Sequence, residues 1–143
     1  IMLYNCNTSK RVKKPFNHVS WMHKQLKLNN FVLQQCLFGL HNLIRITKGD
    51  TICIVESEKT AIIMSIVIPN FLWLATGSKT GFKQEMLNPI KDYTIIAYPD
   101  KTEYQKWTET TELLNKKGFK ISCSNLLEKI DIENGGDLVD FLF

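Results

Sequence analysis

From residue 51 onward, the hydrophobic positions form short unbroken runs that alternate with longer amphipathic stretches. Such runs, when rich in β-branched or aromatic residues, predict β-strands. Four of them occur, at 51–55 (TICIV), 71–75 (FLWLA), 93–98 (YTIIAY) and 119–123 (FKISC). The first run is apolar on both faces, which predicts a central strand, whereas the last alternates and suits an edge.

The stretches between these runs predict helices. They cover 57–68, a weaker segment at 82–90, an amphipathic segment at 103–117 and a short one at 137–143. Ser57 can cap the first helix, Pro69 stops it, and Gly118 closes the third. The order β-α-β-α-β-α-β predicts an α/β fold with a Rossmann-like, four-stranded parallel sheet and helices on both faces. Right-handed crossovers then place all strand carboxyl ends at one edge, where ligands bind in such sheets.

The first fifty residues are less regular. The stretch 7–14 (NTSKRVKK) suggests a turn with a basic strand, and 36–44 (CLFGLHNLI) a turn into a short helix packed against the sheet. We therefore expect two parts, an irregular basic extension at 1–50 packed on the core and an α/β domain at 51–143. Because the sequence starts in mid-pattern at Ile1, we interpret it as a piece of a longer protein.

Composition narrows the class of protein. A chain of 143 residues with 44% hydrophobic residues is typical of a globular domain and excludes a disordered one. No apolar run is long enough for a membrane span, so we expect no membrane partner. The four cysteines include no CxxC pair, and Cys53 and Cys123 lie in predicted strands, which favours a reducing cytoplasm. The spacing of His18, His23 and Cys36 matches no standard zinc site.

Charge is spread unevenly along the chain. Residues 1–50 carry eight lysines and arginines against Asp50 alone, a net charge of +7, whereas 51–143 carry ten against thirteen acids, a net charge of −3. Four cations fall within five residues, which suits contact with the phosphates of DNA or RNA. They are Lys10, Arg11, Lys13 and Lys14. From charge alone, an ordinarily solvated segment is an equal alternative.

Acidic residues follow three of the predicted strands. Glu56 ends the first, Asp100 follows the third with Glu103 nearby, and Asp137 and Asp140 follow the fourth. Clustered carboxylates at one sheet edge suit a hard divalent cation that also contacts phosphates. Each acid has a structural alternative, because acids also cap helices and favour helix starts. Asp100 with Glu103 would then be a capping box, Glu56 a helix-start charge and Asp137 the cap of the last helix.

Several segments together resemble the topoisomerase–primase (Toprim) domain. They are 53–63 (CIVESEKTAII), 73–82 (WLATGSKTGF), 94–107 (TIIAYPDKTEYQKW) and 135–142 (GGDLVDFL). That family has a glutamate after its first strand, an Asp-x-Asp pair after its third and often a GxDxxDxL tail. The likeness extends over 28–143, because 28–44 (LNNFVLQQCLFGLHNLI) is similar to the lead-in of bacterial primases. More narrowly, the chain is similar to Toprim-like proteins of bacterial mobile elements, over the run from 9–24 (SKRVKKPFNHVSWMHK) through 36–39 (CLFG) and 55–61 (VESEKTA) to 98–107 (YPDKTEYQKW).

The resemblance implies a primase-type Toprim domain of a mobile-element or phage-like protein in DNA replication. It implies that Glu56 acts as a general acid/base or ligand, and that Asp100, Glu103 and Asp137 hold Mg²⁺ or Mn²⁺ for nucleotidyl transfer. Lys59 is either a phosphate contact or a solvated lysine. Implied partners are DNA or RNA, nucleotides, and zinc-ribbon or helicase segments elsewhere in a longer chain.

Two positions depart from the family pattern. Ser57 replaces the usual glycine after the glutamate, and Thr102 stands where the second aspartate of Asp-x-Asp falls. Cation binding is therefore expected to be weak or lost. A non-catalytic nucleic-acid-binding or scaffold module with a degenerate site is one alternative, and a Toprim nuclease is another. The primase-like CLFG segment argues against the nuclease.

Overall fold

A computed structural model of the chain describes residues 3–7, 10–12, 15–16 and 20–142. The chain divides into two compact units, 1–34 and 35–143. This division falls earlier than the boundary at residue 50 that the sequence pattern predicted. The segment that precedes the first core strand therefore belongs to the same unit as the sheet.

A four-stranded, all-parallel sheet forms the centre of the second unit. Its strands are β3 (Thr51–Val55), β4 (Leu72–Ala75), β5 (Thr94–Ala97) and β6 (Lys120–Cys123). They lie in the order β4-β3-β5-β6, which confirms the predicted parallel sheet. Strand β3 is internal and β6 is an edge strand, as their patterns of apolar residues indicated.

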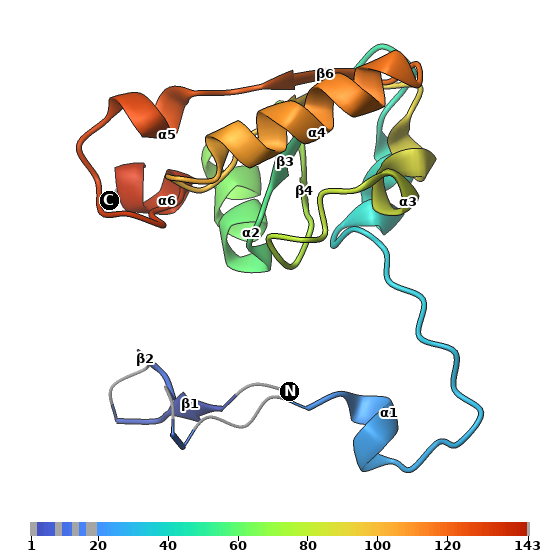
Figure 1. Cartoon of the computed structure of the whole chain (residues 1–143), viewed down its shortest axis with the longest axis vertical. Helices are drawn as coiled ribbons and strands as arrows, with labels where there is room; N and C mark the ends of the chain where they lie inside the picture. Colours follow the sequence, from blue (N-terminus) through green and yellow to red (C-terminus); the bar gives the residue numbers. More distant parts are fainter. Residues whose placement is uncertain (1–2, 8–9, 13–14, 17–19, 143) are drawn as a thin grey trace. The chain divides into compact units, whose positions relative to one another are not determined.

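Helices cover both faces of this sheet (Figure 1). They are α2 (Glu58–Val67), α3 (Gln84–Leu87) with the 3₁₀ turn η2 (Asn88–Ile90), α4 (Tyr104–Lys116), α5 (Leu126–Lys129) and α6 (Leu138–Leu142). The short helix α5 was not predicted. Gly118 follows α4 with φ +87°, as expected of a closing glycine. Ser57 is at the N-cap of α2, the predicted position, although its side chain makes no capping hydrogen bond.

Strand β3 contributes side chains to two hydrophobic clusters, one on each face of the sheet. Ile52 and Ile54 are buried on one face, in a cluster with residues of α3 and α4. Cys53 and Val55 are buried on the other face, in a cluster with residues of α2, α5 and α6. Because successive side chains of a strand point to opposite faces, an apolar residue at every position requires cover on both sides.

The segment before β3 closes the open side of β4. Phe38 forms an antiparallel bridge with Ala75 through two backbone hydrogen bonds of 2.9 and 3.2 Å. Gly39 then turns with φ +82°, and a Cβ there would lie 3.2 Å from the carbonyl oxygen of Trp73. The 3₁₀ helix η1 (Leu40–Arg45) follows, and Leu40 and Leu43 pack against the core. The predicted short helix is present in 3₁₀ form.

The first unit contains a small hairpin and one helical turn. Strands β1 (Tyr4–Asn5) and β2 (Lys10–Arg11) pair antiparallel, and α1 (Met22–Gln25) follows. The basic segment thus contains a strand, as predicted. The side chains of Lys10 and Arg11, and the whole of Lys13, Lys14 and His18, lie outside what the structure describes.

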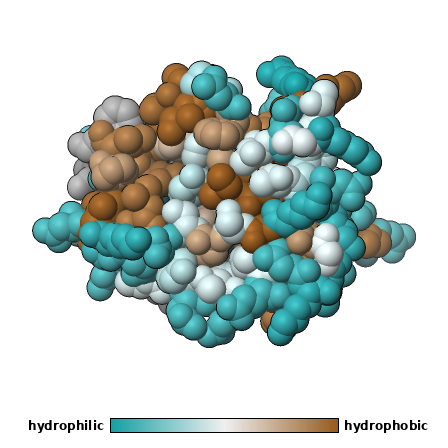
Figure 2. All heavy atoms as spheres, turned by 90° about the horizontal axis from the view of Figure 1, so that it is seen from above, coloured by the Kyte–Doolittle hydropathy of each residue, from teal (hydrophilic) through white to brown (hydrophobic). Residues whose placement is uncertain are grey.

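The surface is mixed in character. Hydrophobic residues reach it among hydrophilic ones, as Figure 2 shows for one face. No helix among the described residues is both long enough and apolar enough to cross a membrane.

Candidate functional site at the carboxyl edge of the sheet

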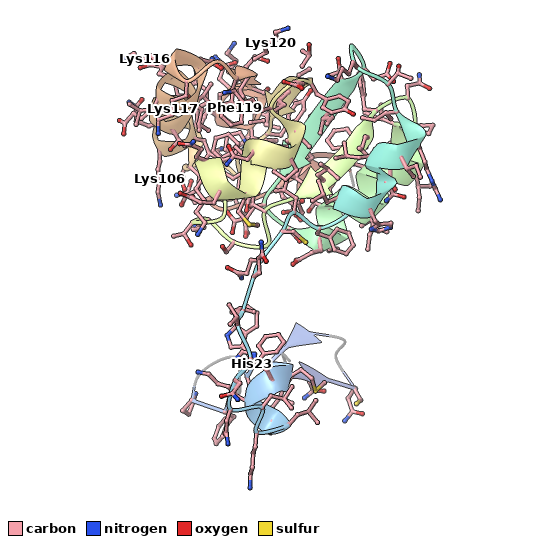
Figure 3. All side chains as sticks on the ribbon, turned by 90° about the vertical axis from the view of Figure 1, so that its right-hand side faces the viewer. His23, Lys106, Lys116, Lys117, Phe119 and Lys120 are labelled. Carbon is pink, nitrogen blue, oxygen red and sulfur yellow. The ribbon has the colours of Figure 1, made fainter. Side chains whose placement is uncertain are left out.

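Glu56 lies directly after β3, at the carboxyl edge of the sheet. Its backbone oxygen accepts a hydrogen bond of 2.9 Å from Gly77 N, which ties it to the loop after β4. Its carboxylate oxygen Oε2 is buried and has no hydrogen-bond partner among the described residues. Burial raises the pKa of Glu56, against the positive charges of Lys79 and of Lys106 on α4 (Figure 3), while the negative charge of Glu103 adds to the rise.

Asp100 lies just beyond the neighbouring strand β5. Its backbone oxygen accepts a hydrogen bond of 2.9 Å from Glu103 N, which turns the chain into α4. Glu103 is the N-cap residue of that helix and makes no side-chain capping bond, so the capping box of Asp100 with Glu103 is not observed. Burial, and next the charges of Glu56 and Asp137, raise the pKa of Asp100 from 3.8 to about 7.

Lys79 brings a positive charge to this edge from the loop between β4 and α3. Its Nζ lies 2.5 Å from Glu103 Oε1. The loop is compact, because a Cβ on Gly81 would lie 2.4 Å from the carbonyl oxygen of Thr76. Glu103, predicted as a metal ligand, is therefore neutralised by a lysine in this structure.

Asp137 is buried, and both of its carboxylate oxygens have partners. Oδ2 accepts a hydrogen bond of 2.5 Å from Thr60 Oγ1 and lies 3.5 Å from Lys59 Nζ. Oδ1 accepts hydrogen bonds from the backbone N–H groups of Val139 and Asp140. Asp140 Oδ2 accepts one in return from Asp137 N, so Asp137 caps α6, as its structural alternative proposed.

These partners set the charge state of Asp137. Burial alone would raise its pKa, but the hydrogen bonds from Thr60 and the backbone, with the charge of Lys59, lower it overall. Lys59 thus lies beside a carboxylate, where the sequence left a choice between a phosphate contact and a solvated lysine. Asp137 is therefore an ionised carboxylate whose hydrogen bonds hold the start of α6 and α2 together.

The position of the second family aspartate has an unusual backbone. Thr102 has φ +82°, a left-handed conformation that β-branched residues rarely adopt. Its N–H donates a hydrogen bond of 2.7 Å to Glu128 Oε1. In the part of the chain that the structure describes, no three His, Cys, Asp or Glu side chains are grouped to hold a metal ion.

The edge therefore contains two kinds of carboxylate. Glu56 and Asp100, at the ends of adjacent strands, have raised pKa values, and the charge of Glu56 contributes to the rise at Asp100. Glu103 and Asp137 instead have lysine partners. Sequence reasoning missed Lys79 and Thr60, because the contacts of both depend on loops and helices distant in the sequence. The one available signal was that Thr60 and Lys79 stand near predicted strand ends.

The fold and this edge define the class, an α/β protein with a four-stranded parallel sheet and acidic residues at its carboxyl end. A family model described as a domain of unknown function (DUF6371) matches residues 1–101, and the chain belongs to this family. The matched region includes Glu56 and Asp100 and ends before Asp137. No curated protein and no solved structure matches the chain.

Proposed function

We propose that this chain is a primase-type Toprim domain of a mobile-element or phage-like protein that binds nucleic acid and a divalent cation. One observation carries the proposal. The carboxylates of Glu56 and Asp100 follow adjacent parallel strands, have raised pKa values, and leave one buried oxygen of Glu56 without a partner. Carboxylates held in this way are costly in the ionised form unless a cation offsets their charge.

The donor set suits Mg²⁺ or Mn²⁺, because it consists of carboxylate oxygens. Glu56 and Asp100 would hold the ion. Asp137 and Glu103 would join them only after leaving Lys59 and Lys79, respectively. When bound, the ion would neutralise nucleotide phosphates.

Other groups of the protein would supply the proton transfer and the phosphate contacts. As an alternative to holding the ion, Glu56 would accept a proton from an attacking hydroxyl group, a role that its raised pKa favours. Lys79 and Lys59, once released from their carboxylates, would contact phosphate oxygens as point charges. The basic segment Lys10–Lys14 would hold the phosphate backbone of DNA or RNA.

A specific observation favours a second candidate, a non-catalytic nucleic-acid-binding or scaffold module. Thr102 replaces the second aspartate, and lysines already neutralise Glu103 and Asp137. In such a module the sheet and the basic segment would serve binding alone.

The test combines binding and activity. Mn²⁺ titration followed by electron paramagnetic resonance measures cation binding to the protein and to Asp100→Asn. We expect binding by the first and a clear loss in the second. Primer synthesis on single-stranded DNA with Mg²⁺ and nucleotides then tests the primase, and a nicking assay tests the nuclease. Nucleic-acid binding with no Mn²⁺ binding and neither activity would replace the primase by the non-catalytic module.

A further inference from the structure

Lys101 follows Asp100, yet its ammonium group is engaged by backbone oxygens. Nζ donates hydrogen bonds of 2.8 Å each to the carbonyl oxygens of Ile130 and Ile132. Both oxygens lie in the loop that connects α5 and α6. Two of the three ammonium protons therefore have fixed acceptors, which is unusual for a lysine that serves only as a surface charge.

The backbone of Lys101 bonds to the same loop. Its N–H donates to the carbonyl oxygen of Gly136 at 2.9 Å, and its carbonyl oxygen accepts from Gly135 N at 3.1 Å. A Cβ on Gly136 would lie 2.9 Å from the carbonyl oxygen of Glu133, so this loop is tightly folded. One residue thus makes four hydrogen bonds to a segment of seven residues, 130–136.

These hydrogen bonds lie next to two carboxylates of the proposed site. Lys101 immediately follows Asp100, and Gly136 immediately precedes Asp137. The hydrogen bond between them therefore joins the direct neighbours of two carboxylates that come from distant parts of the chain. The charge of Asp137 contributes to the raised pKa of Asp100, so the two groups interact across this junction.

We propose that Lys101 is a positioning residue, whose ammonium group holds the 130–136 loop and so fixes Asp137 relative to Asp100 for cation binding. The inference rests on the proposed cation site. Side chains that orient metal ligands without touching the metal affect affinity strongly. Lys101 would act in this way through the loop and would not contact phosphate.

If Lys101 acted only through its positive charge, its removal would change the affinity for Mn²⁺ in the opposite direction, which makes the inference testable. Removing a positive charge near an acidic site strengthens the binding of a cation. Releasing the loop weakens it, because the carboxylates lose their fixed arrangement. The sign of the change in Mn²⁺ affinity therefore separates the two roles.

The experiment compares Lys101→Met with Asn115→Ala. Asn115 is a matched control, because its side chain also makes two hydrogen bonds to backbone, with Ile121 N and O, away from the carboxyl edge. We expect the dissociation constant for Mn²⁺ to rise by roughly 10- to 100-fold in Lys101→Met. We expect it to stay unchanged in Asn115→Ala at a temperature where both variants are folded.

A second measurement does not depend on metal. Amide hydrogen exchange of Gly135, whose N–H bonds to Lys101, should become faster in Lys101→Met while exchange in β3 is unchanged. Should Lys101→Met fail to fold, Lys101→Gln provides the same comparison. Equal or tighter Mn²⁺ binding, or unchanged exchange at Gly135, would overturn the inference. Absence of Mn²⁺ binding in the unmodified protein would instead reject the cation site itself.

Discussion

Thr60 Oγ1 donates a hydrogen bond of 2.5 Å to Asp137 Oδ2 and so joins the first turn of α2 to the start of α6, across 77 residues of sequence. Both residues are buried, with 0% and 7% of their surface exposed. The bond satisfies an ionised carboxylate that water reaches poorly. It therefore connects the stability of the fold to the carboxyl edge.

Loss of this hydrogen bond should destabilise the protein. Thr60→Val keeps the shape of the side chain but leaves the buried carboxylate of Asp137 without this donor. We expect the free energy of unfolding to fall by about 1–3 kcal/mol, measured by urea denaturation. Thr110→Val is the control, since the Thr110 hydroxyl donates a hydrogen bond to the carbonyl oxygen of Lys106 at an exposed position of α4. Equal effects of the two substitutions would contradict a special role for Thr60.

Neutralising Glu56 should separate its two interpretations. Because burial raises the pKa of Glu56, Glu56→Gln should leave the metal-free melting temperature unchanged or higher. The stabilisation by Mn²⁺ should decrease. Glu58→Gln is the control, because Glu58 is an exposed acid in the first turn of α2. A helix-start charge at residue 56 would give the reverse result, a loss of up to about 1 kcal/mol with no Mn²⁺ effect.

Asp100 should make stability depend on pH. Its folded pKa of about 7 exceeds its ordinary value of 3.8, so the native protein keeps a proton that the unfolded chain releases. The contribution of Asp100 to stability is therefore fully present below about pH 4 and is lost as the pH rises to about 7. The raised pKa of Glu56 acts in the same direction.

Urea denaturation between pH 4 and 8 measures this dependence. Asp100→Asn should be less sensitive to pH than the unmodified protein over the interval from about pH 4 to about 7. Identical slopes for the two proteins in that interval would show that Asp100 ionises normally.

Lys79 should compete with a divalent cation. Lys79→Met removes its ion pair with Glu103 and a positive charge near Glu56, so Mn²⁺ should bind more tightly, as measured by isothermal titration. Stability should change by less than about 1 kcal/mol, because the lysine side chain is largely exposed. Lys48→Met is the control, since Lys48 forms a longer and more exposed ion pair with Asp92 before β5. Weaker Mn²⁺ binding in Lys79→Met would instead make Lys79 a supporting residue of the site.

The basic segment should bind phosphates without reading bases. Replacing Lys10, Arg11, Lys13 and Lys14 with alanine should weaken binding to single-stranded DNA of any sequence. The slope of log affinity against log salt should fall by about 0.7 for each lost contact. Alanine at Lys116, Lys117 and Lys120, at the end of α4 and start of β6 (Figure 3), is the control. An unchanged affinity and slope in the first variant would leave the segment as a solvated surface.

Much of the fold could be predicted from the sequence, because the apolar residues of β3 require that both faces of this strand be covered. An unbroken apolar run such as 51–55 is stable only between two covering layers, and that requirement predicts the parallel sheet. Helix α5 could not be predicted in the same way. It has four residues, of which only Leu127 is buried, and so it offers no periodic pattern to read.

The site was harder to predict than the fold. Strand ends locate Glu56 and Asp100, since parallel strands finish at one edge. The charge state of each carboxylate depends on side-chain partners, which the pattern of hydrophobic and polar positions does not reveal. Lys79 reaches Glu103 across 24 residues, and Thr60 reaches Asp137 across 77. Sequence therefore indicated which acids gather, but not which of them are already neutralised.

Thr102 has an evolutionary consequence. A β-branched residue with φ +82° costs of the order of 1–3 kcal/mol, and aspartate or asparagine adopts this backbone more easily. Selection for a functional site usually sacrifices stability. Here a single replacement of threonine by aspartate would relieve backbone strain and add a carboxylate beside Asp100 in the same step. The relief of backbone strain would then offset part of the electrostatic repulsion that a further carboxylate brings to this edge.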